Sequence, residues 1–179
     1  MIHVMPERQP IAVRPHMPGY GVPESPDGLL PWSWAEDRLV RSRNYWIVTA
    51  DVSGRPHSMP TWGVWSADDS VFWFSASATS RKVRNLAHNP QMVVTTDDSV
   101  EVVSVEGHGA PIADAARDRM ADAYAAKYET TPTARKTLAD FVKSGAIFEM
   151  TPERAFGIIE TREDFSQRAT KWVWEGRAP

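Results

Sequence analysis

The sequence has no cysteine. This absence excludes disulfide bonds, thiolate metal sites and cysteine nucleophiles, and it is typical of chains that work in a reducing compartment. Long apolar runs are also missing: the N-terminal stretch has no apolar core of signal-peptide length, and no later stretch is apolar enough to span a bilayer. From these absences we expect a cytoplasmic protein.

The sequence has no excess of basic residues, because it contains 20 Lys and Arg and 23 Asp and Glu, which gives a formal net charge of −3. No overall positive field therefore attracts nucleic acid or anionic lipid, and any anion site must be a local cluster. The five histidines show no metal-ligand spacing, and no HExxH motif, Ser/His/Asp arrangement or Gly-rich phosphate loop is visible. We expect no metal site, no nucleic-acid partner and no membrane partner.

The composition is that of one globular domain with an unusual beginning. The chain has 179 residues, of which 42% are hydrophobic and 24% charged. Residues 1–31 hold seven of the 14 prolines. Because proline interrupts both helices and sheet ladders, we predict an arm over 1–31, either disordered or packed across a partner subunit. The remaining residues, 32–179, are predicted to form the cofactor-binding domain.

Hydrophobic patterning after residue 31 predicts a mainly β protein with peripheral helices. Short aromatic and β-branched runs alternate with turn signals, which indicates an antiparallel sheet or barrel. Pro60 cannot donate to a ladder, so its strand should lie at an edge or carry a bulge. Ser33 with Glu36 predicts a capped helix start, and residues 151–153 predict a turn. The predicted strands are 45–51, 57–65, 71–75, 91–96, 100–109, 146–150, 154–160 and 170–174, and the predicted helices are 34–43, 80–87, 114–127 and 132–143.

Ser80, Arg81 and Lys82 form the most informative local motif, because they open a predicted helix after a strand and a short Ser/Ala/Thr loop. The first turn of a helix has unpaired N–H groups and partial positive charge. Each cation placed there costs about 0.3–1 kcal/mol unless an anion is present. A bound phosphate would reverse the sign of this cost. The alternative is a solvated basic helix start whose cations pair with Asp or Glu from elsewhere.

Several segments, in their order and spacing, resemble the pyridoxamine-phosphate-oxidase-like split barrels, a superfamily of flavin and deazaflavin oxidoreductases. The resemblance covers roughly residues 35–175. It implies a six- to seven-stranded antiparallel split β-barrel of the FMN-binding type. It also implies a homodimer with its cofactors in clefts between the subunits. The segments that carry it are 55–65 (RPHSMPTWGVW), 72–74 (FWF), 80–86 (SRKVRNL), 89–90 (NP) and 102–107 (VVSVEG).

The resemblance implies a cofactor-binding role for particular residues. In the family, the serine-arginine-lysine segment grips the cofactor phosphate, and the strand before it approaches the same group. The second strand of the family passes along the cofactor ring, and a basic-aromatic C-terminal segment reaches the ring from the partner subunit. The phosphate-side residues are Ser75, Thr79, Ser80, Arg81 and Lys82, the ring-side residues are His57, Ser58, Met59, Pro60, Thr61 and Trp62, and the C-terminal residues are Lys171 and Trp172.

Two departures from the family pattern bear on activity. The chain lacks the arginine-rich C-terminal motif of pyridoxamine phosphate oxidase, and Val102 stands where the oxidases have a polar residue. Both argue against oxidation of vitamin B6. The sequence looks closer to the actinobacterial branch that uses the deazaflavin coenzyme F420. We therefore expect an F420-dependent oxidoreductase that transfers a hydride between the deazaflavin and a small unsaturated or quinone-like substrate. The alternatives are an FMN-dependent enzyme of the same superfamily, or a non-catalytic flavin, deazaflavin or haem binder.

Overall fold

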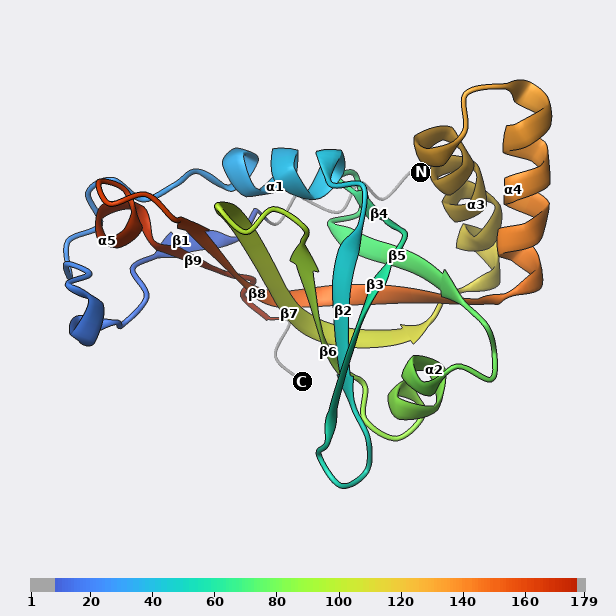
Figure 1. The fold of residues 1–179 in the computed structure, drawn as a ribbon, viewed down its shortest axis with the longest axis horizontal. Helices are drawn as coiled ribbons and strands as arrows, with labels where there is room; N and C mark the ends of the chain where they lie inside the picture. The colour runs from blue at the N-terminus through green and yellow to red at the C-terminus, as the bar shows by residue number, and fades with distance from the viewer. Residues whose placement is uncertain (1–8, 177–179) are drawn as a thin grey trace.

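The computed structural model describes residues 9–176, which form an antiparallel sheet with helices at its periphery (Figure 1). Within these residues, no helix is both long and apolar enough to cross a membrane. In chain order the elements are β1 (Ile11–Val13), the 3-10 helix η1 (Pro18–Tyr20), α1 (Trp32–Arg41), β2 (Tyr45–Ala50), β3 (Pro56–Thr61), β4 (Gly63–Ser66), β5 (Val71–Ala76), α2 (Arg81–Leu86), β6 (Gln91–Thr96), β7 (Glu101–Pro111), α3 (Asp114–Tyr128), α4 (Pro132–Ser144), β8 (Ala146–Ile159), α5 (Phe165–Arg168) and β9 (Thr170–Val173).

The longest strand, β8, organises the sheet. One edge of β8 pairs with β7 over most of its length. The other edge pairs first with β5, at 146–150, and then with β9, at 154–157. The ladder continues from β7 through β6 and β2 to β3, while β4 pairs with β5. All these pairings are antiparallel, which confirms the predicted mainly β, antiparallel fold.

The chain itself completes the barrel. Strands β3 and β4 are separated by Trp62 alone, so β2, β3–β4, β5, β8, β7 and β6 follow one another around a ring. Within the described residues no ladder joins β4 to β2, so hydrogen bonds do not close the sheet. Strand β3 pairs with β2 on one side only, which confirms the edge position predicted from Pro60. The result is the predicted split barrel, with an open strand edge at the split.

Buried side chains form two clusters on opposite faces of β5. Phe72 and Phe74 point into the barrel, where α1 covers the core. Val71 and Trp73 point the other way, toward the α3–α4 hairpin. This division follows from the two-residue period of a strand, since successive side chains alternate between its faces. In Figure 1 the α3–α4 hairpin stands at the end of the molecule opposite β1, β9 and α5.

The predictions for the first helix and the second strand were wrong in detail. Helix α1 begins at Trp32 after Pro31, and Ser33 lies inside the helix, where no side chain caps it. Proline pre-sets the backbone angle that a helix start needs, so the helix begins earlier than the capping box suggested. The strand predicted over 57–65 divides into β3 and β4, because the chain bends at Trp62 between two different partners.

Two further predictions are corrected by the sheet. The turn predicted at 151–153 is wrong, because these residues lie inside the continuous strand β8. The pairing of β8 with β7 shifts register there, between Glu106 and Gly107. A Cβ on Gly107 would lie 2.1 Å from the Thr151 carbonyl oxygen, so glycine is required where the two backbones approach at this irregularity. In the arm predicted to lack a ladder, Ile11–Val13 pairs with β9. Residues 1–8 of that arm lie outside the described residues.

One tyrosine joins the α3 helix to the bend of the barrel. The Tyr128 hydroxyl accepts a hydrogen bond from the Gly63 N–H at 2.9 Å and donates to the Arg43 carbonyl oxygen at 2.7 Å. We predict that Tyr128→Phe lowers the free energy of unfolding by about 1–3 kcal/mol, because the buried Gly63 N–H loses its partner. Urea denaturation measures this change. Tyr20→Phe is the control, since Tyr20 is 66% exposed and its removal should change stability by less than about 0.5 kcal/mol. Equal stability of both variants would contradict the prediction.

Candidate functional site

The ring-side residues predicted on β3 divide between two faces of the strand. Residues directly opposite each other in an antiparallel pair share a face. His57 lies opposite Thr49, and Met59 opposite Ile47, so both share the face that β2 turns toward the core. Thr61, opposite the buried Tyr45, belongs to the same face. Ser58 and Pro60 instead lie opposite Val48 and Trp46, on the outer face. Side chains from both sets cannot contact the same side of one ligand.

Helix α2 is held against the inner face of β2 by a buried hydrogen bond. The Asn85 side-chain amide donates to the Thr49 hydroxyl at 2.9 Å. Asn85 and Thr49 are 4% and 2% exposed, so neither group has water as an alternative partner. Because Thr49 is also the cross-strand neighbour of His57, this bond brings α2 beside the inner face of β3. The start of α2 and the predicted ring strand therefore meet although they are distant in sequence.

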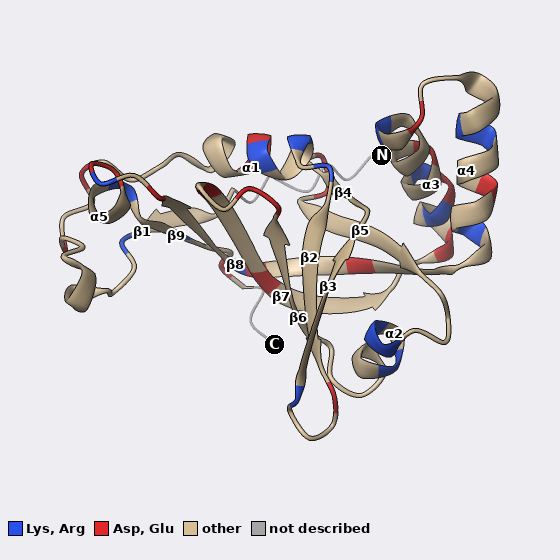
Figure 2. Cartoon of the chain, in the orientation of Figure 1, with Lys and Arg blue, Asp and Glu red and all other residues tan. Residues whose placement is uncertain are grey.

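The start of α2 carries cations without acidic partners. The helix predicted from Ser80 begins at Arg81 with Ser80 as its N-cap, and the Ser80 side-chain oxygen accepts from the Val83 N–H at 3.4 Å. Arg81 is exposed and Lys82 half-buried, and in the part of the chain that the structure describes neither makes an ion pair. Figure 2 shows α2 with basic residues and no acidic one. The alternative of a basic helix start neutralised by the protein's own carboxylates is thus not what the described residues show.

Thr79 has a structural role next to these cations. Its carbonyl oxygen accepts from the Arg84 guanidinium at 2.5 Å, which turns Arg84 back toward the loop. The Thr79 hydroxyl lies 3.1 Å from that of Ser77. Of the three cations on α2, Arg81 and Lys82 are therefore the two that remain available to a ligand.

His57 completes a cationic corner with Arg81 and Lys82. Burial, and then the positive charges of Arg81 and Lys82, lower the pKa of His57 below its ordinary value. Burial also lowers the pKa of Lys82. The Nδ1 atom of His57 is buried and has no hydrogen-bond partner among the described residues. We call His57, Arg81 and Lys82 the cationic corner. Its unpaired cations and unpartnered nitrogen fit an anionic group.

Trp62 and Ser75 lie at a different place, in the wall of a cavity of about 440 Å³ between β5 and the α3–α4 hairpin. The Ser75 hydroxyl donates to the Val142 carbonyl oxygen at 3.4 Å. The Trp62 ring stacks on Tyr128, with 4.4 Å between ring centroids and an interplanar angle of 5°. Strand β3 connects the two places, since His57 and Thr61 are separated by about 14 Å along an extended strand.

The C-terminal residues Lys171 and Trp172 are not brought to this region of their own chain. Both lie on β9, at the far end of the sheet from α2 (Figure 1). Trp172 has no exposed surface and packs on Trp32 and Trp34 in the core. We therefore leave the Trp172 ring out of the site, because it has no surface with which to contact a ligand. Lys171 is half-buried, and its amino group lies 5.9 Å from the Phe156 ring.

Sequence reasoning missed Asn85, Tyr124 and Tyr128. Asn85 was part of the SRKVRNL segment, but its sequence position did not reveal that it anchors the helix to Thr49. Tyr124 and Tyr128 are four residues apart on α3, a spacing that places both on one face of a helix. That spacing was visible in the sequence, yet nothing in it indicated that this face meets Trp62.

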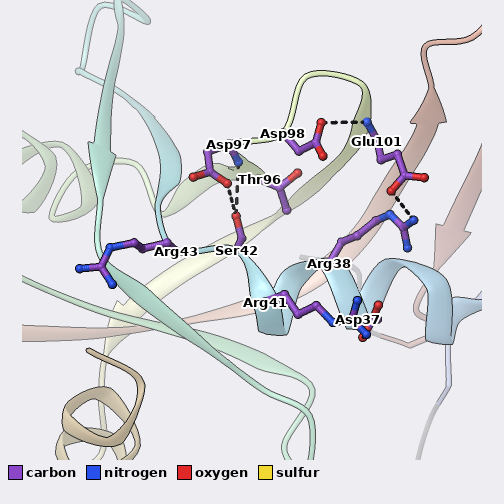
Figure 3. Close-up of a pocket in the computed structure, with 9 residues that line it drawn as sticks. All are labelled: Asp37, Arg38, Arg41, Ser42, Arg43, Thr96, Asp97, Asp98 and Glu101. Carbon is purple, nitrogen blue, oxygen red and sulfur yellow. Dashed lines mark hydrogen bonds and ion pairs between the residues drawn. The ribbon is translucent and has the colours of Figure 1, made fainter. Parts of the chain in front are cut away.

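A second cavity, of about 310 Å³, lies between the end of α1 and the β6–β7 turn and contains none of the predicted site residues (Figure 3). Four of the seven charged residues that line it form two ion pairs. Arg38 binds Glu101, and Arg41 lies 2.7 Å from Asp37. The Ser42 hydroxyl donates to Asp97 at 2.6 Å. This pairing leaves little charge for a ligand, so we place the candidate site at the cationic corner and along β3.

The fold and the family comparison define the class: the chain is a split-barrel protein of the pyridoxamine 5'-phosphate oxidase type. The family model for pyridoxamine 5'-phosphate oxidase matches residues 35–158. The chain therefore belongs to the pyridoxamine 5'-phosphate oxidase family, as its sequence motifs predicted. No curated protein matches the sequence.

Solved structures share this fold at low sequence identity. A conserved hypothetical protein from Mycobacterium tuberculosis, Rv2991, superposes with a TM-score of 0.63 and 18% identity, over 84% of this chain and 89% of the other. An F420 reductase gives a TM-score of 0.51 and 19% identity, over 73% and 98%. HutZ, a heme storage protein from Vibrio cholerae, gives 0.52 and 15%, over 68% and 87%. At these identities the likeness shows the fold alone.

The electrostatic coupling within the cationic corner is directly testable. We predict that Arg81→Gln raises the pKa of His57 in the ligand-free protein, because protonation of the imidazole then meets one positive charge fewer. NMR titration of the His57 ring resonances measures the shift. The matched control is Arg135→Gln, an exposed arginine on α4 that should leave the His57 titration unchanged. An unchanged titration in Arg81→Gln would show that the guanidinium does not face His57.

Proposed function

We propose that the protein is an oxidoreductase that binds coenzyme F420 and transfers a hydride between the deazaflavin and a small unsaturated or quinone-like substrate. Membership of the family supports a flavin-type cofactor, and the likeness to an F420 reductase agrees with the deazaflavin. The observation that carries the proposal is the cationic corner. Arg81 and Lys82 have no acidic partner among the described residues, and they lie close enough to His57, whose Nδ1 atom has no hydrogen-bond partner there, for their charges to lower its pKa.

The cationic corner is suited to the cofactor phosphate. Hydrogen bonds between cationic donors and phosphate oxygens are roughly twice as strong as neutral ones. In the proposed complex, Arg81 and Lys82 hold the phosphate, and the hydroxyls of Ser80 and Thr79 lie close enough in sequence to join them. Neutralisation by the phosphate would also remove the mutual repulsion of the two cations.

The ring of the cofactor is proposed to lie along β3. The outer edge of this strand has no strand partner in the described part of the chain, so its free backbone groups can bind a ring. Met59 and Thr61 share the face of His57, and Trp62 follows at the end of the strand. An elongated cofactor with a phosphate at one end and a tricyclic ring at the other fits this order of residues.

A bound deazaflavin would supply the hydride chemistry, which requires no protein nucleophile. Reduction of a quinone-like acceptor takes two electrons and two protons, and a hydride carries both electrons and one proton. The second proton must come from solvent or from an O–H or N–H group of the protein. The contribution of the chain is therefore to bind, orient and shield the reactants.

Titration of the purified protein with coenzyme F420, FMN and FAD tests the cofactor assignment. We predict that coenzyme F420 binds most tightly of the three cofactors. Changes in absorbance and fluorescence measure the binding. The double variant Arg81→Ala/Lys82→Ala should weaken this binding at least about tenfold, which corresponds to roughly 1.4 kcal/mol, because two charge-assisted contacts are lost. The same dipeptide occurs at Arg135 and Lys136 on the exposed side of α4, so Arg135→Ala/Lys136→Ala is a matched control.

Other results select other functions. Preferential FMN binding would favour the FMN-dependent enzyme, and a Soret band on addition of haem would favour a haem protein, the alternative that agrees with the likeness to HutZ. Cofactor binding without turnover across enones and quinones would favour a carrier. Equal F420 affinity in the parent and in Arg81→Ala/Lys82→Ala would remove the phosphate assignment.

We also propose that the protein is a homodimer in which Lys171 reaches the cofactor of the partner subunit. The proposal is supported by the free edge of β3 and by exposed apolar residues beside it, since Trp46 and Met59 are each 46% exposed.

We predict that Lys171→Ala weakens cofactor binding in the dimer. In a monomer produced by Trp46→Glu, the same change should have no effect. Sedimentation equilibrium gives the oligomeric state, and a monomeric parent protein would end this proposal.

A further inference from the structure

The cavity beside Trp62 has the size and lining of a small-molecule site. Its volume of about 440 Å³ falls within the usual range for ligand pockets, about 300–1,000 Å³. Helix α4 contributes Leu138 and Phe141, helix α3 contributes Tyr124, and the end of β5 contributes Ser75 and the following loop. None of the residues that line the cavity is charged. Such a lining disfavours ionic ligands, because their charge would be desolvated without a partner.

An ordered aromatic wall forms one side of this cavity. Trp62 stacks face to face on Tyr128, whose hydroxyl is fixed by the backbone of Gly63. The Tyr124 ring lies 4.9 Å from the Tyr128 ring and 6.5 Å from the Trp62 ring. Trp62 is 38% exposed, so part of its ring remains uncovered after this packing. A wall of flat rings held in place favours a flat ligand, which can stack without further ordering of the side chains.

The hydroxyl groups in the lining differ in whether they have partners. Ser75 donates to the Val142 carbonyl oxygen, and Ser144 donates to the Phe141 carbonyl oxygen at 2.7 Å. The Ser77 hydroxyl pairs with Thr79. The Tyr124 hydroxyl, in contrast, makes no hydrogen bond to any described residue; the residue is only 5% exposed, but the hydroxyl oxygen itself is not fully buried, so a ligand can reach it. Burial raises the pKa of Tyr124, so this hydroxyl stays protonated and can donate at neutral pH.

We infer that this cavity binds the substrate, a flat apolar molecule with a ring carbonyl, and that Tyr124 donates a hydrogen bond to the carbonyl oxygen. The inference rests on the proposed function and names the place and chemistry of its substrate. Quinones and cyclic enones have the required shape, a neutral ring and an acceptor oxygen. A hydrocarbon would leave the Tyr124 hydroxyl without a partner, and a carboxylate would bring a charge into an uncharged wall.

The position of the cavity agrees with this assignment. Trp62 directly follows β3, along which the cofactor ring is proposed to lie. Ser77 and Ala78, which also line the cavity, are followed in the chain by Thr79 and the start of α2. The cavity therefore borders both parts of the proposed cofactor site: Trp62 links it to the ring strand, and Ser75, Ser77 and Ala78 link it to the phosphate side.

The experiment compares two ligands of the same shape, 2-methyl-1,4-naphthoquinone and 2-methylnaphthalene, which lacks the carbonyl groups. Binding to the purified full-length protein is measured by ligand-observed NMR titration without cofactor. The absence of cysteine removes the thiols with which a quinone would react. We expect Tyr124→Phe to weaken quinone binding about fivefold, the effect of one lost hydrogen bond, while naphthalene binding changes less than about twofold. Tyr20→Phe is the matched control and should change neither.

Blocking the cavity tests its location. Leu138→Trp should abolish binding of both ligands, whereas Thr137→Trp, which adds the same ring one residue earlier at an exposed position outside the lining, should preserve it. If Leu138→Trp does not fold, Phe141→Ala takes its place. Phe141→Ala should weaken both ligands about threefold to tenfold through lost apolar contact.

Four results would overturn the inference. The first three are no quinone binding to the parent protein, unchanged binding in the cavity variants, and an equal loss of affinity for both ligands in Tyr124→Phe. The fourth is a parent protein that is a dimer, binds no quinone and becomes a monomer when Phe141 is changed to Asp. The last would show that a second copy of the chain covers the cavity. Coenzyme F420 titrations on the same samples report separately on the proposed function. Quinone binding that depends on Tyr124, in a protein that takes up neither F420 nor FMN, would remove the proposed function and leave the cavity assignment standing.

Discussion

The buried hydrogen bond from the Asn85 amide to the Thr49 hydroxyl determines where the short helix α2 lies. Helix α2 is only six residues long, and its apolar contacts with the core come from Leu86 and Val83, so this bond is the specific polar contact that fixes its position beside β2. With it, Arg81 and Lys82 lie close enough to His57 for their positive charges to lower its pKa. The site that we propose for the cofactor phosphate depends on this interaction together with the packing of Leu86 and Val83 against the core.

The rest of the site follows the direction of β3. At the His57 end, the surroundings are cationic and contain no acidic partner among the described residues; at the Trp62 end, they are aromatic and uncharged. An open strand edge joins the two ends, because the barrel is closed by the chain and not by a ladder between β2 and β4. The site thus changes from cationic at one end to aromatic at the other. An elongated, phosphorylated ring compound fits this change best, with an apolar substrate beside its ring.

Much of the fold could be predicted from local pattern. The aromatic and β-branched runs of β2 and β5 and the proline that restricts β3 to an edge act over a few residues. Two of the errors arose where a distant segment changed the local outcome. The Thr-Pro-Glu sequence at 151–153 reads as a turn, yet β7 supplies a glycine that allows β8 to continue. The proline-rich arm reads as unable to pair, yet β9 offers it an edge.

By itself, the sequence determined the class of the protein: its antiparallel strands, its helices, the family motifs and the basic start of α2. Only the tertiary structure decided which of the nominated residues meet. It separated Ser58 and Pro60 from Met59 and Thr61, buried Trp172 in the core, and joined Tyr124 and Tyr128 to Trp62. The physical reason is that the period of a strand or helix sets which residues share a face, whereas the neighbour of that face is set by pairings between segments far apart in the chain.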